Sequence, residues 1–462
     1  LLAFLIPVSW LAYKQLGNPV APLVYGAQLG KIAKLEDALL ESPAEREVVA
    51  IYQQRASNYA ARLQDVEGSL ERERSAAQER VHRLRAQNAD VGLIVAASRE
   101  VAAMPRDADT ARALWAEQMQ QNLDRARPLG GLPRQTQTYA GDPQGTPQER
   151  ADFENTRRNF LALMFCLMVG TAGLPHLLTR YYTSSTVSGA RRSVAWSLFF
   201  IGLLYLSAPA LAVLAKFEVM NNLVGSSFDA LPNWMGQWAR VDPALLSVED
   251  VNRDGIVQFG EIHLGADLIM LATPELGGLP YVVSGLVAAG GLAAALSTAD
   301  GLLLTISNAL VRDLYFQSRS RTASPEQRVI LTKFALLAVA LVAAFVAALK
   351  PSDILPMVSA SFSMAASAFV PVMVLGIFWR GTTRQGAVAG MLAGLGVAVY
   401  YILSHVPMLQ ALPAWVRADG LWFGIQPVSA GVFGVPAGLL VALLVSWWTR
   451  PVLPRPAIRL EM

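Results

Sequence analysis

The stretch GLAAALSTADGLLLTISNALVRDLY, residues 291–315, decides the class of this protein. It lies in an apolar run, residues 279–311, in which Asp300 is the only charged residue. A transmembrane α-helix needs about 20 apolar residues, so a run of this length predicts a tilted membrane span. The side chains of Ser297, Thr298 and Asp300 are costly at membrane depth unless they bind a polar partner. Because hard cations take oxygen ligands, a dehydrated alkali cation is the candidate partner.

The Ser297-Thr298 pair and the Asp-Leu-Tyr ending at residues 313–315 resemble the eighth core helix of the sodium/solute symporter family. This family includes proline permease, acetate permease and the sodium–glucose cotransporters. The resemblance implies a sodium site made by the main-chain oxygen of Ala294 and the hydroxyls of Ser297 and Thr298, completed by carbonyls of a broken first core helix. In the alternative, both hydroxyls donate to carbonyls four residues earlier, as Ser and Thr often do in membrane helices.

The same resemblance covers most of residues 1–20 and 158–450, and it implies an all-α integral membrane protein. The expected fold is that of the leucine transporter, a bundle of two inverted five-helix repeats with binding sites at their interface. The chain begins with apolar Leu-Leu-Ala-Phe and no charged leader. We therefore expect the C-terminal part of a longer protein. It would hold the end of the fifth core helix, the second repeat and two additional helices, without the first four core helices.

The composition fits a membrane protein with a polar region. Apolar residues make up 53% of the chain and charged residues 16%. The formal net charge of +3 is too small to indicate nucleic-acid binding. Cys166 is the only cysteine, which excludes an intrachain disulfide framework. The sequence contains no nucleophile–base pair, metal-hydrolase spacing or phosphate loop, so we do not expect an enzyme.

Eight hydrophobic segments predict the membrane topology. They are residues 1–13, 159–178, 194–215, 280–311, 329–349, 354–378, 386–406 and 427–449. Arginines follow the second, fourth, sixth and eighth segments, so the positive-inside rule predicts a multi-pass protein of the bacterial cytoplasmic membrane with a cytoplasmic C-terminus. The predicted parts are a truncated transmembrane helix and its exit (1–27), an extracytoplasmic helical insertion with a linker (28–157), the transmembrane transporter core (158–450) and a cytoplasmic tail (451–462).

The polar insertion predicts a small group of helices. Ser42-Pro43-Ala44-Glu45 has the pattern of a helix start with a capping box. A heptad seam follows, formed by Val49, Tyr52, Ala56, Tyr59, Leu63, Val66 and Leu70. Further helices near 90–104 and 108–126 predict a hairpin or three-helix bundle, and residues 128–147 have the composition of a linker. The insertion is either a solvated decoration or a docking or gating cap, for which a small membrane subunit is the candidate partner.

Residues 170–182, GTAGLPHLLTRYY, place two glycines and a proline inside an apolar segment. Such residues interrupt a helix, and in membranes interruptions are tolerated where backbone lines a cavity. The segment resembles the sixth core helix of the family, with the Gly-x-Pro-His of proline permease. The resemblance implies solute contacts from Gly170, Gly173, Pro175 and His176. In the alternative, His176 caps or hydrogen-bonds a neighbour, and the glycines and proline reflect only their frequency in membrane helices.

Residues 250–261, DVNRDGIVQFGE, fit the twelve-residue calcium loop of an EF-hand. Oxygen side chains stand at positions one, three, five and nine, a glycine at six, a main-chain carbonyl at seven and a glutamate at twelve. The residues that would bind Ca²⁺ are Asp250, Asn252, Asp254, Ile256, Gln258 and Glu261. We expect the following FGEIHLGADLIMLA to form the exiting helix. The alternative is an acidic turn that only looks like the motif.

Asp300 lies near the helix face of Ser297 and is a candidate coupling residue. Family members often carry a small or polar residue there, so this carboxylate could bind a second cation, carry a proton or form an ion pair. The resemblance implies sodium-coupled symport by rocking of the repeats. The similarity of GLPHLLTRYYT and ALSTADGLLLTISNAL to the bacterial branch near acetate permease points to a small monocarboxylate. A transporter-like sensor that binds solute without accumulating it is the alternative.

Overall fold

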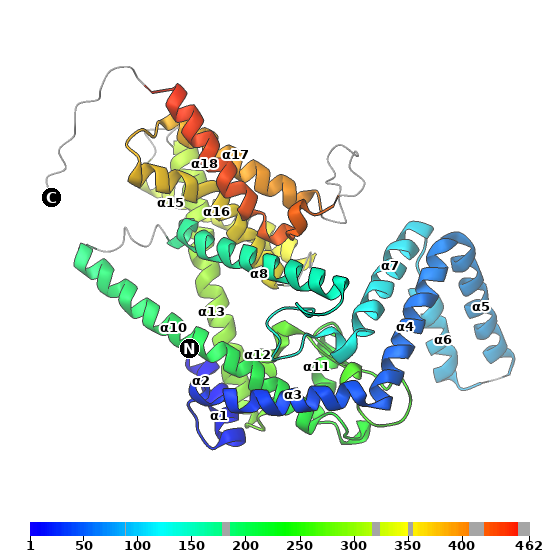
Figure 1. The fold of residues 1–462 in the computed structure, drawn as a ribbon. Helices are drawn as coiled ribbons and strands as arrows, with labels where there is room; N and C mark the ends of the chain where they lie inside the picture. Colours follow the sequence, from blue (N-terminus) through cyan, green and yellow to red (C-terminus); the bar gives the residue numbers. More distant parts are fainter. Residues whose placement is uncertain (88, 178–184, 317–323, 350–353, 406–419, 451–462) are drawn as a thin grey trace. The chain divides into compact units, whose positions relative to one another are not determined.

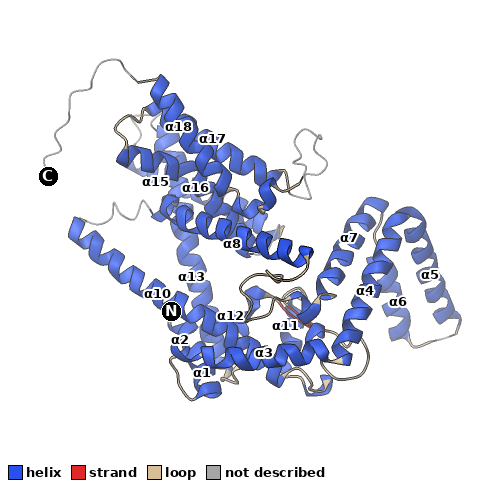
Figure 2. Ribbon diagram, in the orientation of Figure 1, coloured by secondary structure: helices blue, strands red, loops and turns tan. Residues whose placement is uncertain are grey.

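The computed structural model describes residues 1–462 except 88, 178–184, 317–323, 350–353, 406–419 and 451–462. The described residues are mostly helical, with one short two-stranded sheet (Figure 1, Figure 2). The chain divides into two units, residues 1–138 with 203–288 and residues 139–202 with 289–462. The predicted cytoplasmic tail and residues 178–182 of the predicted solute segment lie outside the described residues.

The first unit is held together by an apolar core between α1, α10 and α12. Leu11, Leu214 and Leu268, one from each of these helices, are fully buried in one cluster. The helices of this unit are α1 (Leu2–Leu16), α2 (Ala21–Val24), α3 (Gly26–Glu41), α4 (Pro43–Gln64), α5 (Val66–Ala86), α6 (Val91–Ala103), α7 (Ala108–Arg125), part of α10 (Val187–Asn222), α11 (Asn233–Val241), α12 (Ala266–Leu276) and the start of α13 (Tyr281–Asn308).

Helices α4 to α7 make up the helical part of the predicted insertion. The helix start at Pro43 and the two helical stretches on either side of Pro105 are confirmed. The uninterrupted seam is wrong, because α4 ends at Gln64 and Asp65 caps a new helix, α5, by accepting the main-chain N–H of Gly68. The bundle therefore contains four helices among the described residues. Its buried apolar residues include Val66, Leu70, Ala111 and Trp115.

The sheet overturns the predicted exiting helix after the EF-hand-like loop. Strand β1 (Leu246–Val248) pairs antiparallel with β2 (Ile262–Leu264), so that Leu246 lies opposite Leu264. The loop ends in a 3-10 turn, Phe259–Glu261, that leads directly into β2. Helix α12 starts only at Ala266. The pairing with β1 gives the main chain of residues 262–264 hydrogen-bond partners that do not require a helix.

The second unit is built on close helix packing. Its helices are α8 (Pro147–Gly173), α15 (Pro325–Ala348), α16 (Ile354–Phe378), α17 (Arg384–Leu403) and α18 (Gly431–Trp448), together with the adjoining parts of α10 and α13. A π-helical turn, Ala309–Phe316, continues α13. A Cβ atom on Gly390 of α17 would lie 2.6 Å from the Cβ of Ala442 in α18. Small residues thus let these two helices approach closely, as in many membrane proteins.

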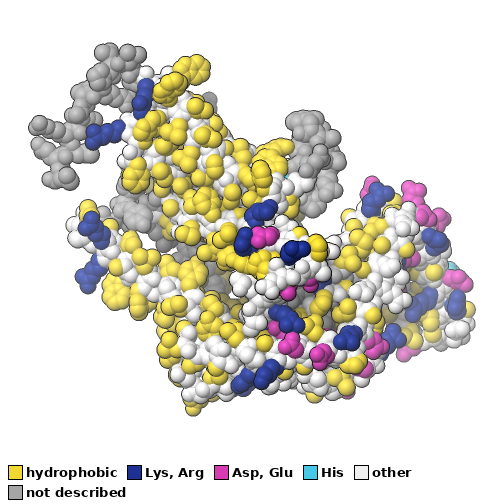
Figure 3. Space-filling model, in the orientation of Figure 1, with side chains coloured by type: hydrophobic (Ala, Val, Ile, Leu, Met, Phe, Trp, Pro, Cys, Tyr) yellow, Lys and Arg dark blue, Asp and Glu magenta, His cyan; other side chains and the backbone are white. Residues whose placement is uncertain are grey.

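Six helices among the described residues are long and apolar enough to cross a membrane. They are Val187–Asn222, Tyr281–Arg312, Glu326–Ala348, Ile354–Phe378, Arg384–Leu403 and Pro427–Trp448. The other two predicted segments are helical but do not reach this length of apolar helix: α1 has 15 residues, and α8 begins in a charged stretch and ends at Gly173. Figure 3 shows hydrophobic side chains over the visible surface of α16 to α18 and charged side chains over α4 to α7. The structure is that of a helical membrane protein with a polar helical part.

Candidate functional site

Helix α13 carries the predicted sodium ligands Ala294, Ser297 and Thr298. The side chains of Ser297 and Thr298 are exposed. The Thr298 hydroxyl donates to the Ala294 carbonyl at 3.2 Å, the local bond that Thr often makes in membrane helices. Within α13 the Ala294 carbonyl also accepts the helical main-chain N–H of Thr298, so both of its lone pairs are used, whereas the Thr298 hydroxyl oxygen keeps its own. A cation at this position would have to replace the hydroxyl bond to Ala294, which is the local bond that the alternative interpretation predicts for Thr298.

Asp300 is exposed on the same helix and forms no hydrogen bond or ion pair with any described residue. The next basic residue along the chain, Arg312, lies in the π-helical segment after α13, and the α-helix between Asp300 and Asn308 alone separates them by about 12 Å at 1.5 Å per residue. An ion pair within the helix is therefore out of reach. A carboxylate at membrane depth needs a cation, a proton or a basic side chain from elsewhere.

The predicted interruption in the solute segment is present in the structure. Helix α8 ends at Gly173, Leu174 is extended with φ −69° and ψ 116°, and a helical turn resumes at Pro175. Pro175 and His176 are half-buried. The interruption places non-helical backbone at the end of an apolar helix, where main-chain groups become available to a ligand.

The two glycines of this segment are buried against α16. A Cβ atom on Gly170 would lie 2.5 Å from the carbonyl oxygen of Phe362, and one on Gly173 would lie 2.9 Å from that of Ala365. These distances are too short for any side chain. Gly170 and Gly173 therefore allow close contact between α8 and α16.

A row of buried serines on α16 was missed by the sequence analysis. Ser359, Ser363 and Ser367 are each no more than 1% exposed and recur every four residues on one helix face. The Ser363 hydroxyl donates to the carbonyl of Val428 at 2.6 Å, whereas the Ser367 hydroxyl donates to the main-chain carbonyl of Ser363 at 2.7 Å. The sequence signal that could have revealed this row is the four-residue spacing of its small residues, which is typical of closely packed membrane helices.

The EF-hand-like loop forms a tight turn held by its own side chains. Asp250 Oδ2 accepts the N–H of Gly255 at 3.1 Å, and Asp254 Oδ1 accepts that of Ile256 at 2.7 Å. Gly255 has φ 74°, the left-handed conformation for which position six of the motif requires glycine. Arg253 shares this conformation with φ 62°, which is unusual for a residue with a side chain.

Two buried glutamates fix the end of this loop. Both carboxylate oxygens of Glu261 accept main-chain N–H groups, from Val251 at 2.7 Å and from Gln258 at 3.1 Å. Glu45 of α4 accepts the N–H groups of Phe259 and Gly260, so the predicted capping-box role of Glu45 is wrong. Burial raises the pKa of both carboxyl groups, and the main-chain hydrogen bonds partly oppose this shift.

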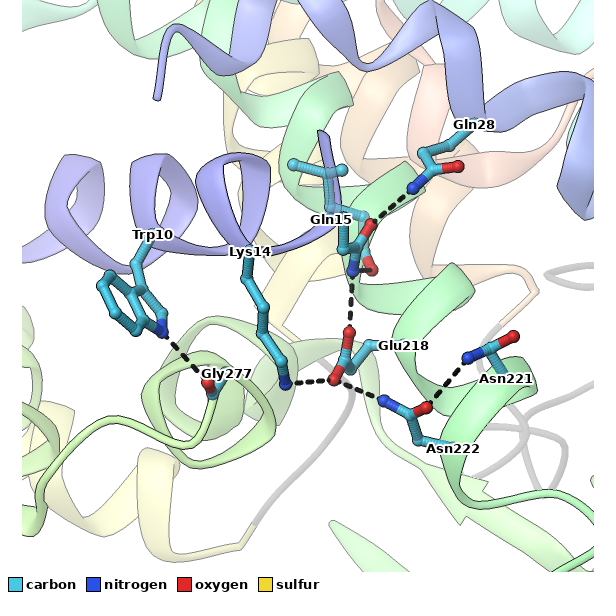
Figure 4. Close-up of polar contacts among 9 residues, drawn as sticks. Trp10, Lys14, Gln15, Gln28, Glu218, Asn221, Asn222 and Gly277 are labelled. Atoms are coloured by element: carbon cyan, nitrogen blue, oxygen red, sulfur yellow. Dashed lines mark hydrogen bonds and ion pairs between the residues drawn. The ribbon is translucent and has the colours of Figure 1, made fainter. Parts of the chain in front are cut away.

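A buried polar network joins α1 to α10 (Figure 4) and was also missed by the sequence analysis. Glu218 of α10 is 4% exposed. Its carboxylate accepts hydrogen bonds from Lys14 at 2.6 Å, from Gln15 at 2.9 Å and from Asn222 at 2.6 Å. Each acidic oxygen thus has a charged or amide donor, as a buried carboxylate requires. The sequence signal that could have revealed this network is the presence of two charged residues, Lys216 and Glu218, directly after the apolar segment 194–215.

A buried ion pair joins α10 to α3, two residues before Glu218 along α10. Lys216 Nζ and Glu36 Oε1 are 2.6 Å apart, and their side chains are 11% and 1% exposed. Glu36 also accepts the main-chain N–H of Gln135 at 3.0 Å. The pair ties α3 and the segment after α7 to α10.

Comparison with known proteins identifies a family signature that includes α13. Residues 271–394 match the model of the sodium:solute symporter family. An uncharacterized symporter of Cupriavidus necator is 48% identical, over 98% of this chain and 65% of that protein. A monocarboxylic acid transporter of Corynebacterium glutamicum is 28% identical, over 63% of this chain and 46% of that protein.

A shorter match extends to a high-affinity proline transporter, PutP, of Bacillus subtilis. It is 36% identical over 129 residues, which is 28% of this chain and 27% of that protein. The chain therefore spans 65% or less of the length of each of these three relatives.

Proposed function

We infer that the chain belongs to the sodium:solute symporter family, whose model matches residues 271–394, and that the protein carries a small solute across the cytoplasmic membrane together with Na⁺. The observation that carries this proposal is the polar group of α13. Ser297, Thr298 and Asp300 lie in the matched range 271–394 and in a candidate membrane span. Oxygen atoms at this depth are tolerated when they serve an ion or a solute.

The proposed sodium site takes the Ala294 carbonyl and the hydroxyls of Ser297 and Thr298. The hydroxyl of Thr298 and the carbonyl of Ala294 lie 3.2 Å apart through the bond that the alternative predicts, and Na⁺ in the proposed site would replace that bond. The remaining oxygens, to a total of about five, come from segments outside this chain, as the resemblance to the family implies. The fold of the whole protein would be the leucine-transporter arrangement of two inverted repeats, with the C-terminus in the cytoplasm and residues 28–157 outside.

The proposed solute site lies at the interruption after α8. Pro175 and His176 stand at the break, and Gly170 and Gly173 set its position by packing against α16. A small monocarboxylate is the proposed solute class. The monocarboxylic acid transporter matches 63% of this chain, whereas the proline transporter matches 28%.

The test is solute uptake by the full-length protein in proteoliposomes. The panel holds radiolabelled acetate, propionate, pyruvate, proline and glucose, each with an inward gradient of Na⁺ or of K⁺. We expect accumulation of the monocarboxylates with the Na⁺ gradient and none with K⁺. Accumulation of proline or glucose instead would overturn the solute class. Binding of solute without accumulation would overturn symport and indicate a sensor.

Asp300 is the proposed coupling residue. Its carboxylate has no partner among the described residues, so it is open to a second cation or a proton. Asp300→Asn should change the Na⁺ or pH dependence of uptake. An unchanged dependence with reduced expression alone would assign Asp300 to a structural ion pair.

A further inference from the structure

Two buried oxygen atoms of the loop 250–261 have no hydrogen-bond partner. They are Asp250 Oδ1 and Gln258 Oε1, and the Gln258 side chain is only 5% exposed. A buried polar atom without a partner costs on the order of 1–3 kcal/mol, so such atoms are rare in folded proteins. Both belong to positions one and nine of the motif, and both are acceptors, so a cation satisfies them.

The main chain leaves a third acceptor open at position seven. The carbonyl of Gly255 accepts the N–H of Phe228 at 3.1 Å, and that of Val257 accepts the N–H of Gly225 at 2.8 Å. Between them, the Ile256 carbonyl accepts no hydrogen bond from any described residue. This is the main-chain oxygen that the twelve-residue loop gives to calcium.

The open atoms favour calcium over other cations. Among the residues that the structure describes, no three His, Cys, Asp or Glu side chains form a group that could hold a metal ion by themselves. A cation in this loop must therefore take amide and main-chain oxygens together with carboxylates. Calcium accepts six to eight such mixed oxygens in flexible geometry, whereas Mg²⁺ demands a near-ideal octahedron and Zn²⁺ favours nitrogen and sulfur.

The loop is bound to helix α4 by direct contacts. Glu45 accepts the main-chain N–H groups of Phe259 and Gly260, at positions ten and eleven of the motif. Val251, at position two, is buried with Val48 and Tyr52 of α4. A change in the order of the loop is therefore passed to α4 through both its main chain and its apolar side chains.

We propose that residues 250–261 bind Ca²⁺ and that Glu45 transmits the resulting ordering to α4. The ligands are the side chains of Asp250, Asn252, Asp254, Gln258 and Glu261 and the carbonyl of Ile256. This site is independent of the proposed transport function, and its test does not measure uptake. A single loop without a paired loop has modest affinity, with a Kd of about 10⁻⁴–10⁻³ M.

The test is hydrogen exchange of the full-length protein in detergent, followed by mass spectrometry during titration with CaCl₂ or MgCl₂. We expect Ca²⁺ to slow exchange in residues 250–261 and in the first turns of α4, and Mg²⁺ to have little effect. Asp254→Asn should raise the Kd for Ca²⁺ by tenfold or more. Asp254 is exposed, so this variant is expected to fold.

Two further variants separate binding from transmission. Glu249→Gln is the matched control, because Glu249 directly precedes the loop and pairs with Arg55 at the surface. It should leave the Kd within twofold of the parent value. Glu45→Gln should keep Ca²⁺ binding but weaken the slowed exchange in α4, because only the apolar contact of Val251 with α4 then remains.

Three results would overturn the proposal. The absence of a saturable Ca²⁺ effect in the parent protein would exclude the site. An equal loss of affinity in Glu249→Gln and Asp254→Asn would show a nonspecific response to charge. Slowing of exchange in α4 that is undiminished in Glu45→Gln would exclude transmission through Glu45.

Discussion

The end of α10 and the middle of α13 place acidic side chains on apolar helices in opposite ways. In α10, Glu218 is buried and accepts three hydrogen bonds from donors within the chain. In α13, Asp300 is exposed and has no partner among the described residues. The first arrangement is complete as it stands, whereas the second requires a partner that the described residues do not supply. The difference separates polar groups that hold the fold from polar groups available to an ion or solute.

The same distinction applies to glycines. Gly170 is in close contact with the backbone of α16, whereas a Cβ atom on Gly285 of α13 would meet nothing within 4 Å. Residues of the packed regions should therefore be sensitive to any change of shape or charge. Substitutions in α13 should change uptake more than they change the free energy of unfolding.

The largest expected effect is on the buried ion pair of Glu36 and Lys216. Lys216→Met removes the cation and leaves the Glu36 carboxylate buried, which should cost about 3–5 kcal/mol of stability. The matched control is Arg134→Met, whose partner Asp37 adjoins Glu36 but forms an exposed pair. That change should cost no more than about 1 kcal/mol. Thermal unfolding in detergent measures both, and equal losses would contradict the assigned role of burial.

A smaller effect is expected from glycine substitution. Gly170→Ala brings a methyl group against the Phe362 carbonyl and should destabilise the protein by about 1–3 kcal/mol. Gly285→Ala should be neutral or stabilise by up to about 1 kcal/mol, because alanine is the better helix former and space is open. The same unfolding assay compares them. A large loss in Gly285→Ala would mean that α13 is tightly packed at that position.

The smallest expected effect is the pH dependence contributed by Glu45. Burial raises the pKa of this carboxyl group in the folded protein, so protonation of Glu45 stabilises the folded state relative to the unfolded state. Its contribution is therefore complete below the unfolded-state pKa and is lost as the pH rises through the folded-state pKa. Unfolding temperatures between pH 4 and pH 8, measured without Ca²⁺, should show this slope in the parent protein. Identical slopes in the parent and Glu45→Gln would contradict it.

Much of the fold could be predicted because its signals are local. The proline after Ser42 marks the start of α4, Pro105 separates α6 from α7, and the glycine-proline pattern marks the break after Gly173. Gly255 adopts the left-handed conformation that its motif position requires. Each of these features depends on residues within one or two turns of the chain.

The failures involve partners that are distant in the sequence. Glu45 has the correct spacing for a capping box, but the N–H groups of Phe259 and Gly260 compete successfully for its carboxylate. Residues 262–264 form a strand because β1 is available to pair with them. The networks of Glu218 and Glu36 likewise join helices far apart in sequence. For α13 the sequence names only the three candidate ligands that lie together on one helix of the proposed sodium site.

The most direct measurement is the Na⁺ concentration that gives half-maximal uptake in Ser297→Ala and Thr298→Ala. Loss of one oxygen ligand to a charged group costs about 1.5–3 kcal/mol, so this concentration should rise by tenfold or more. Thr305→Ala is the control, because Thr305 lies on α13 and its hydroxyl donates to the Gly301 carbonyl at 2.7 Å. Its half-saturating Na⁺ should stay at the parent value. If the value also stays unchanged in both Ser297→Ala and Thr298→Ala, the cation binds elsewhere.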